Sequence, residues 1–278
     1  MGGANKDQAK FWSDQAGPDW VANKDMMDAV MVNLTAKLVE HANPGPDEVI
    51  LDIGCGTGAS ANIVADRLET GRVLATDIAE TMLARARQDA SSKIDFLLAD
   101  AQTHDFGKGQ FDLVVSRFGT MFFSDPVAAF SNIRRALKPG GRLAMVCWSR
   151  LADNPWFGAP ARAAIARLGK PAPTDPTAPG PLAFQDADRV LGILAQAGFS
   201  DAAVMTETVH LDHPDFETLV AHAAESGPAS RILLEKGCDE ADKAAITEGV
   251  RAEFEPYRRG KAAAVPASLH YFTARNPG

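Results

Sequence analysis

The stretch VILDIGCGTG at residues 49–58 joins a short apolar run to a glycine-rich turn. The run from Val49 to Ile53 has the composition of a buried strand, because a parallel strand covered on both faces is apolar along its whole length. The glycines that follow let the backbone turn tightly and approach a ligand without a Cβ clash. The stretch therefore predicts a strand, a ligand-binding loop and then a helix.

Further apolar runs alternate with helical stretches on the C-terminal side of this motif. Strand-like runs occupy 72–76, 94–98, 111–115 and 142–148. The helix before the last of these runs is marked by Asp125 as N-cap and Pro126 at its first position. Such an alternation predicts a doubly wound α/β fold, in which helices cover both faces of a parallel sheet.

Outside this core the pattern is more helical. Residues 25–41 form an amphipathic pattern that predicts one N-terminal helix. After residue 150, helical stretches at 153–170, 186–197 and 214–257 are interrupted by β-prone runs at 202–211 and 268–274. The core sheet is therefore expected to carry two helical excursions, at about 150–184 and 213–263.

Composition restricts the classes of partner. The chain has 28 basic and 36 acidic residues, a net charge of −8, which disfavours nucleic-acid binding. Cys55, Cys147 and Cys238 are odd in number and far apart, which argues against a disulfide framework and fits a reducing compartment. A polar N-terminus and the absence of a long apolar run indicate neither a signal peptide nor a membrane span. We therefore expect a cytoplasmic protein without nucleic-acid or membrane partners.

Three carboxylates follow three successive strands of the predicted sheet. Asp52, Asp77 and Asp100 each stand at or just past a strand's carboxyl end, the edge where doubly wound sheets bind ligands. Three acidic groups around one ligand suit a molecule with several donors and net positive character. They suit a pyrophosphate poorly, because like charges repel at short range.

The glycine loop by itself leaves a dinucleotide site open. Gly54, Gly56 and Ala59 also satisfy the G-x-G-x-x-G/A pattern, and Asp77 lies near the distance of a ribose-binding acidic residue. A nicotinamide-dependent oxidoreductase, however, needs neither Asp52 nor Asp100. It would also show a catalytic tyrosine–lysine pair or an equivalent, which the chain lacks.

Residues 49–58, Asp77, Asp100–Ala101, 111–116 and 137–143 together resemble the ordered motifs of class I S-adenosylmethionine-dependent methyltransferases. The resemblance is closest to the enzymes of ubiquinone and menaquinone biosynthesis, and it is specific over about 48–148. It implies a Rossmann-like seven-stranded sheet in the order 3-2-1-4-5-7-6, with strand seven antiparallel. The run at 202–211 would be strand six and the run at 268–274 strand seven.

The resemblance also implies roles for the cofactor site. Asp52 and the glycine-loop backbone would surround the methionine part of S-adenosylmethionine, Asp77 would accept from both ribose hydroxyls, and Asp100 would accept from the adenine amino group. The predicted cofactor-binding residues are Trp20, Asp52, Gly54, Cys55, Gly56, Gly58, Asp77, Ile78, Met82, Asp100, Ala101, Gln102, Ser116 and Arg117.

Two of these residues carry specific expectations. Arg117 departs from the small polar residue or Asn that relatives often have, and a cation beside a sulfonium is unfavourable. We expect it to point toward the methionine carboxylate or an acidic substrate. Trp20 is expected to form a flap over the cofactor, although it could instead pack the N-terminal helix onto the sheet.

The sequence indicates the residues that bind the methyl acceptor less specifically than those that bind the cofactor. Candidate pocket residues, which could equally be core, are Phe118, Met121, Phe122, Trp156 and Phe157. A general base is needed only if the acceptor holds a proton of high pKa, and the candidates are His210, His213, His222 and Tyr257. His210 and His213 have no third ligand nearby, so no metal site is expected.

The function predicted from these observations is in-line methyl transfer from S-adenosylmethionine to a small-molecule acceptor, with S-adenosylhomocysteine as the product. Alternatives left open are a nicotinamide-dependent oxidoreductase, an RNA methyltransferase and a non-catalytic S-adenosylmethionine-binding protein.

The predicted segments are an N-terminal helical cap at 1–46, the cofactor-binding core at 47–150, a helical insertion at 151–184, a core continuation at 185–212, a substrate-side helical insertion at 213–263 and a final core strand at 264–278.

Overall fold

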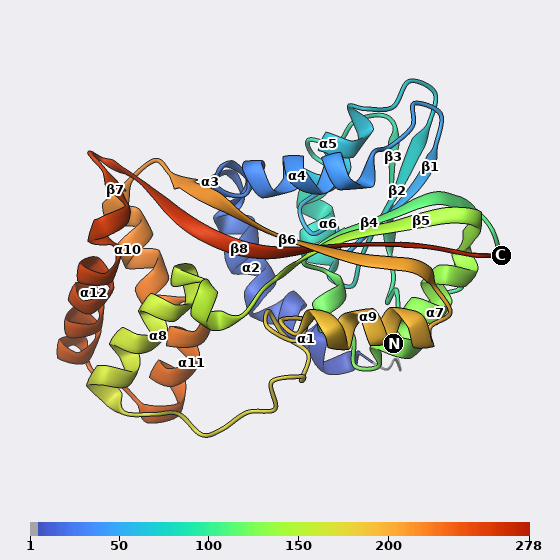
Figure 1. The fold of residues 1–278 in the computed structure, drawn as a ribbon. Helices are drawn as coiled ribbons and strands as arrows, with labels where there is room; N and C mark the ends of the chain where they lie inside the picture. Colours follow the sequence, from blue (N-terminus) through green and yellow to red (C-terminus); the bar gives the residue numbers. More distant parts are fainter. Residues whose placement is uncertain (1–4) are drawn as a thin grey trace.

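One mixed sheet runs through the protein in the computed structural model, which describes residues 5–278 (Figure 1). Its strands are β1 Val49–Ile53, β2 Arg72–Asp77, β3 Ile94–Leu98, β4 Phe111–Arg117, β5 Leu137–Trp148, β6 Ser200–His213, β7 Arg258–Arg259 and β8 Ala262–Arg275. They are ordered β3-β2-β1-β4-β5-β8-β6, and the short β7 pairs with β8.

This sheet confirms the predicted fold class and strand order. Strands β1 to β5 are parallel, while β8 runs antiparallel to both β5 and β6. The predicted seventh strand is β8, because the two-residue β7 precedes it in the chain. No sequence pattern indicated β7, since two residues are too few to show a period.

Helices cover both faces of the sheet. In Figure 1, α4 and α5 lie above it, and α7 and α9 lie below it. The α-helices are α1 Lys6–Asp14, α2 Ala16–Ala22, α3 Lys24–Val30, α4 Val32–Ala42, α5 Ala59–Ala65, α6 Glu80–Ala86, α7 Pro126–Ala136, α8 Pro155–Leu168, α9 Ala187–Gln196, α10 Phe216–Glu225, α11 Gly227–Lys236 and α12 Glu240–Phe254. Short 3-10 turns lie between helices and strands at η1 Thr120–Phe122, η2 Leu151–Asp153 and η3 Glu255–Tyr257.

The N-terminal region is more divided than predicted. The single helix expected over 25–41 is two helices, α3 and α4, which meet at Met31. The division has a packing reason, because α3 contacts β6 whereas α4 also packs on β4, β5 and β8. Before them lie α1 and α2, which contact α6. The first four residues of the predicted cap lie outside the described residues.

The two C-terminal excursions come together in space. Strands β6 and β8 extend beyond the predicted runs as a two-stranded ribbon, from Thr208 opposite Ser268 to His213 opposite Ala263. The ribbon leads to α10, α11 and α12, and all three pack against α8 from the first excursion. We call α8 and α10–α12 the helical subdomain, which Figure 1 shows at the left of the sheet.

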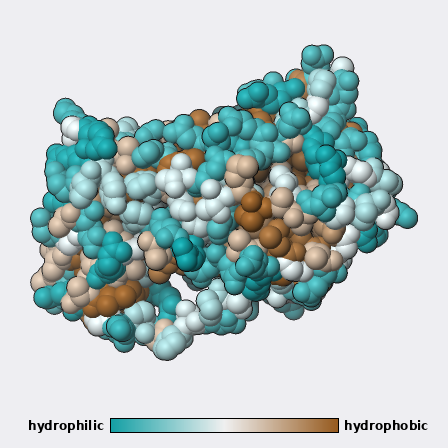
Figure 2. All heavy atoms as spheres, viewed as in Figure 1, coloured by the Kyte–Doolittle hydropathy of each residue, from teal (hydrophilic) through white to brown (hydrophobic). Residues whose placement is uncertain are grey.

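The outer surface is mainly hydrophilic on the face drawn in Figure 2, with apolar patches over the middle of the sheet and at the lower end of the helical subdomain. Large apolar side chains that stay exposed are Phe11, Val32, Met205 and Leu234. Among residues 5–278, no helix is long and apolar enough to cross a bilayer.

Candidate active site

The carboxyl ends of β1, β2 and β3 lie side by side at one edge of the sheet. In the parallel register Asp52 lies beside Ala75, and Asp77 lies beside Leu98, two residues before Asp100. Asp77 is close enough to Asp52 to affect its titration. The fold therefore places the three predicted carboxylates at neighbouring strand ends.

The glycine loop after β1 is held against β2 by its own backbone. The N–H groups of Gly54 and Cys55 both donate to the carbonyl of Thr76, at 2.9 and 3.0 Å. Gly54, Gly56 and Gly58 all have positive φ angles, a conformation that side chains rarely adopt. The loop conformation thus requires glycine at each of the three positions.

A second close approach at this edge involves Gly119, which the sequence reasoning missed. A Cβ on Gly119 would lie 2.5 Å from the carbonyl oxygen of Ile53 and 2.7 Å from Cα of Gly54. The turns after β1 and β4 therefore contact each other through backbone atoms, with no side chain between them. The available signal was a glycine four residues past the end of the predicted strand at 111–115.

Asp52 is fully buried, and only one of its two carboxylate oxygens has a hydrogen-bond partner among the described residues. Ser60 Oγ donates to Oδ2 at 2.7 Å, while Oδ1 has no hydrogen-bond partner among the described residues. Burial raises the pKa of Asp52 to about 6, against the lowering effects of Ser60 and Arg117. Asp52 does not cap the helix that follows the loop, because the N-cap of α5 is Gly58. A buried oxygen acceptor without a donor suits a cationic amino group.

Asp77 faces the glycine loop. Its Oδ2 accepts from the Gly56 N–H at 2.8 Å, and its Oδ1 accepts from the Ala79 N–H at 2.9 Å. Burial raises the pKa of this carboxyl, and the two N–H donors oppose that shift. Met82 on α6 also reaches the loop, since its Cε is 3.1 Å from the position that a Cβ on Gly56 would take. Ile78 directly follows the carboxylate in the chain.

Asp100 anchors the loop after β3 and, with it, the start of α1. Its Oδ1 accepts from the Gln102 N–H at 3.0 Å and from the Asn5 side chain at 2.8 Å. Its Oδ2 is buried without a partner among the described residues. The Gln102 side chain accepts from Ser124 Oγ and from the Asp125 N–H. Gln102 thus ties protein loops together, and Asn5 is a site residue that no sequence signal indicated.

Ser116 and Arg117, at the end of β4, are both engaged by protein groups. Ser116 Oγ donates to the Ile53 carbonyl at 2.8 Å. Arg117 is buried; its Nη1 donates to Thr35 Oγ at 3.2 Å, and its Nη2 lies 3.8 Å from Asp28 Oδ1. Burial lowers the pKa of Arg117, and nearby Asp28 and Asp52 oppose this. The contact of Arg117 with a substrate or cofactor carboxylate stays a prediction.

The predicted pocket residues fall into two aromatic groups. Phe118 stacks on Trp148 with ring centroids 4.8 Å apart, and Trp148 makes an edge contact with Phe157 at 4.8 Å. Trp148, at the end of β5, was missed, although it ends a predicted strand at the ligand-binding edge.

The second aromatic group lies under the N-terminal helices. Trp12 on α1 makes edge contacts with Phe122 at 5.2 Å and with Trp20 at 6.4 Å. Met121 is buried beside Phe122 in η1. Trp20 therefore packs within the N-terminal helices, and its role as a flap over a cofactor stays a prediction.

The fold brings two of the candidate bases, His213 and His222, to the same indole and places the other two elsewhere. His213 is buried and stacks on Trp156 at 5.0 Å, and His222 lies 6.4 Å from the same indole. His210 is three residues before His213, so it points from the opposite face of the ribbon. Tyr257 lies in η3, near Arg162.

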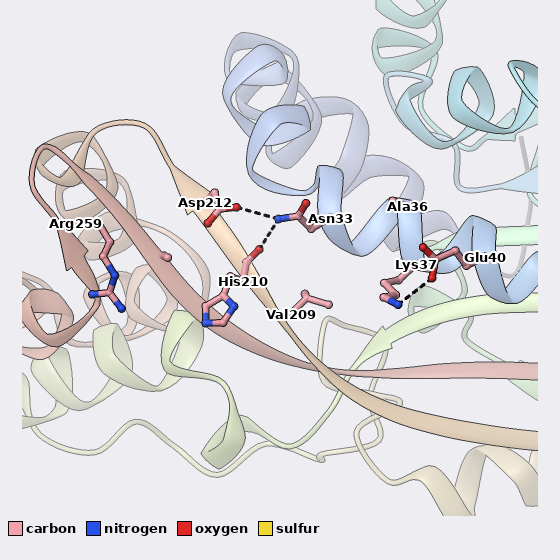
Figure 3. A pocket seen from close by; sticks show the side chains of 9 residues that line it. Asn33, Ala36, Lys37, Glu40, Val209, His210, Asp212 and Arg259 are labelled. Atoms are coloured by element: carbon pink, nitrogen blue, oxygen red, sulfur yellow. Dashed lines mark hydrogen bonds and ion pairs between the residues drawn. The ribbon is translucent and has the colours of Figure 1, made fainter.

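His210 instead lines a groove between α4 and the ribbon (Figure 3). Lys37 pairs there with Glu40, and Asn33 donates to Asp212 at 2.9 Å. This groove lies on the α4 side and contains none of the predicted cofactor residues. Within residues 5–278, no group of three or more His, Cys, Asp or Glu side chains is arranged to hold a metal ion.

The comparisons with known proteins agree with this geometry. Residues 51–145 match the methyltransferase domain family. Over 141 residues the chain is 36% identical to the ubiquinone/menaquinone biosynthesis C-methyltransferase UbiE of Paraburkholderia phymatum, covering 48% of this chain and 58% of that protein. The chain spans about half the length of the curated relatives it matches.

Two solved structures show the same fold. A Haemonchus contortus phosphoethanolamine N-methyltransferase, in complex with S-adenosylhomocysteine, aligns with a TM-score of 0.53 and 19% identity over 88% of this chain and 53% of that chain. The [4+2]-cyclase SpnF aligns with a TM-score of 0.56 and 20% identity over 95% and 96% of the two chains.

The fold and the family match together define the class. The chain carries a class I S-adenosylmethionine-dependent methyltransferase domain, as the sequence motifs predicted. Within that class it resembles the UbiE-type enzymes. The cofactor of the class is S-adenosylmethionine. Asp52 Oδ1 and Asp100 Oδ2 are buried acceptors without a partner in the described part of the chain, which fits a ligand with amino groups.

Proposed function

We propose that this chain transfers a methyl group from S-adenosylmethionine to a small-molecule acceptor in the cytoplasm. The observation that carries the proposal is a pair of buried carboxylate oxygens on Asp52 and Asp100 that have no hydrogen-bond partner among residues 5–278. They lie on either side of Asp77 and its glycine loop. An unmade hydrogen bond at a buried polar atom is costly, so each oxygen is expected to meet a donor when the site is in use.

Each residue has a distinct role in this proposal. Asp52 would hold the ammonium group of the methionine part, and Asp100 would accept from the adenine amino group. Asp77 would give up the hydrogen bond that it accepts from the Gly56 N–H and accept from the ribose hydroxyls instead. The cofactor supplies an already activated methyl group, so the protein mainly aligns the two partners and excludes water. Alignment of this kind contributes roughly 7–11 kcal/mol in well-oriented reactions.

The small size of the acceptor is supported by charge and by architecture. A net charge of −8 disfavours RNA. The helical subdomain stands next to the carboxyl ends of β4 and β5, where Trp148 meets Phe157.

Cys55 and Cys147 are buried free thiols, which suits the cytoplasm. A cyclase on the same fold shows that the fold alone does not specify methyl transfer.

The cofactor assignment is tested by isothermal titration with S-adenosylmethionine. Asp77→Ala removes two charge-assisted hydrogen bonds and is expected to weaken binding at least 30-fold, given about 1.5–3 kcal/mol for each such bond. Asp95→Ala, an exposed carboxylate on β3, is the matched control. Equal affinities for the wild-type protein and Asp77→Ala would show that the ribose assignment is wrong.

The acceptor class is tested by locating the transferred label. Methyl-labelled S-adenosylmethionine is incubated with the protein and, in parallel, a soluble metabolite extract or total RNA. Label on a metabolite supports the proposal. Label on RNA contradicts the small-molecule assignment, and binding without transfer to either pool favours a binding-only protein.

A further inference from the structure

A buried cation lies on the same face of the sheet as Asp52. In the parallel register Asp52 of β1 lies beside Val115 of β4. Side chains alternate between the two faces along a strand, so Arg117, two residues further along β4, points to the same face as Asp52 and Val115. Arg117 is only 8% exposed. A guanidinium group keeps its proton in proteins, so this buried charge needs anionic partners.

The partners of Arg117 on the N-terminal helices do not use up its charge. Its Nη1 donates to Thr35 Oγ on α4 at 3.2 Å, and this partner is neutral. Its Nη2 lies 3.8 Å from Asp28 Oδ1 on α3, which is too long for a hydrogen bond. Asp28 already has a closer cation, Lys24, whose Nζ lies 3.0 Å from Oδ2. The charge of Arg117 is therefore available to the carboxylate on β1.

Asp52 is surrounded by groups with opposing effects. Ser60 on α5 donates to Oδ2 at 2.7 Å. Burial above all, and also the like charge of Asp77 on β2, raises the pKa of Asp52, whereas Ser60 and Arg117 lower it. Cys55 in the glycine loop stays a neutral thiol, because burial raises its pKa. Arg117 thus supplies the opposite charge that a buried carboxylate requires.

We propose that Arg117 is a positioning residue whose charge keeps the Asp52 carboxylate ionised at neutral pH, ready for the ammonium group of S-adenosylmethionine. This inference rests on the proposed function, in which Asp52 holds that group. Arg117 acts through Asp52 and needs no contact of its own with the reacting atoms. Ser60 occupies Oδ2, so the ammonium group would meet Oδ1, which has no partner among the described residues.

The test measures how the binding of S-adenosylhomocysteine to the full chain depends on pH, by isothermal titration from pH 5 to pH 8.5. The ligand's own titration is common to all proteins compared. Arg117→Met removes the charge, and Arg117→Gln also keeps an amide that can donate to Thr35. In both, the midpoint, at which affinity is half its maximum, should rise by about one pH unit or more. The reason is that an adjacent arginine lowers the pKa of a carboxyl group by about 1–3.

Two further variants separate the charge from the packing. Arg117→Lys keeps a cation and should bring the midpoint back close to the wild-type value. Asp28→Asn weakens the same Arg117–Asp28 contact but leaves the cation in place, so the midpoint should not rise. A rise in Asp28→Asn as large as in Arg117→Met, or no rise in the two neutral variants, would overturn the inference.

The ionisation of Asp52 is also read without any ligand. The ¹³C carboxyl signal of Asp52, assigned with Asp52→Asn, is followed through the same pH range in protein labelled at aspartate. Its titration should move to higher pH in Arg117→Met and Arg117→Gln, and an unchanged titration would refute the inference independently of binding. Failure of the wild-type protein to bind S-adenosylhomocysteine would instead refute the proposed function.

Discussion

The side-chain amide of Asn5 donates a 2.8 Å hydrogen bond to Oδ1 of Asp100, which lies 95 positions further along the chain. Oδ1 of Asn5 in turn accepts from the N–H of Ser124. One residue before α1 therefore joins the loops that follow β3 and β4. The N-terminal helices are thus attached directly to the carboxylate proposed to bind adenine.

We expect Asn5→Ala to loosen these helices. The variant loses the hydrogen bonds of the Asn5 side chain with Asp100, Gln102 and Ser124. Their loss corresponds to at least about 1–2 kcal/mol of local opening free energy, or roughly 5–30-fold faster amide exchange in α1 and α2. Hydrogen exchange followed by mass spectrometry measures the rates. Asn23→Ala is the matched control, because within residues 5–278 the side-chain amide of Asn23 donates only to the nearby Asp19 carbonyl. Equal exchange in the two variants would contradict this role for Asn5.

We expect Gly119→Ala to destabilise the fold. Its Cβ would lie 2.5 Å from the backbone oxygen of Ile53, so the turns after β1 and β4 would have to separate. Overpacking of this kind costs about 1–3 kcal/mol in the free energy of unfolding, measurable by urea denaturation.

The control for Gly119→Ala is Gly192→Ala within α9, where nothing described lies within 4 Å of the new Cβ. That variant should be about 0.5–1 kcal/mol more stable than the wild-type protein, because alanine favours a helix interior. A Gly119→Ala protein as stable as the wild type would refute the close contact.

The pKa of Asp52 makes cofactor binding depend on pH. Only the ionised carboxylate attracts an ammonium group, and with a pKa of about 6 the ionised fraction rises from pH 5 to pH 7. Affinity for S-adenosylmethionine should therefore increase about tenfold across this interval. Asp52→Asn should bind weakly and nearly independently of pH over the same range. A flat wild-type profile would contradict the role of Asp52.

Burial of His213 predicts a loss of stability in acid. Its pKa is lowered from 6.5 to about 4 in the folded protein, so between these values the unfolded chain takes up a proton that the folded protein does not. The free energy of unfolding should fall by up to about 3 kcal/mol from pH 7 to pH 4 through this residue. Subtracting the profile of His213→Phe isolates the contribution. Parallel profiles for the two proteins would show that the ring is accessible to protons.

Much of the fold was predictable from local patterns. The alternation of apolar runs with helical stretches over 49–148 predicted the parallel strands, and the motif resemblance predicted the strand order that the structure confirms. The strand-end positions of Asp52, Asp77 and Asp100 were also accessible, because parallel strands bring their carboxyl ends to one edge. The roles of these residues in binding stay predictions.

Relationships across the chain were not predictable in the same way. The division of the helices at Met31 depends on what each half packs against, which no helical period encodes. The opposite orientations of His210 and His213 depend on β6 continuing past Leu211, where the predicted strand ended. The single helical subdomain depends on α8 meeting α10–α12, two excursions that are far apart in the sequence.

The amino-acid sequence by itself determined the β1 strand, its glycine loop and the spacing of the three acidic residues, because these features follow from backbone conformation and from periods of a few residues. The tertiary structure alone decided which distant groups meet: Asn5 with Asp100, Gly54 with Gly119, and Trp156 with His213. Such contacts are set by the packing of whole elements against one another. A short sequence pattern carries no information about that packing.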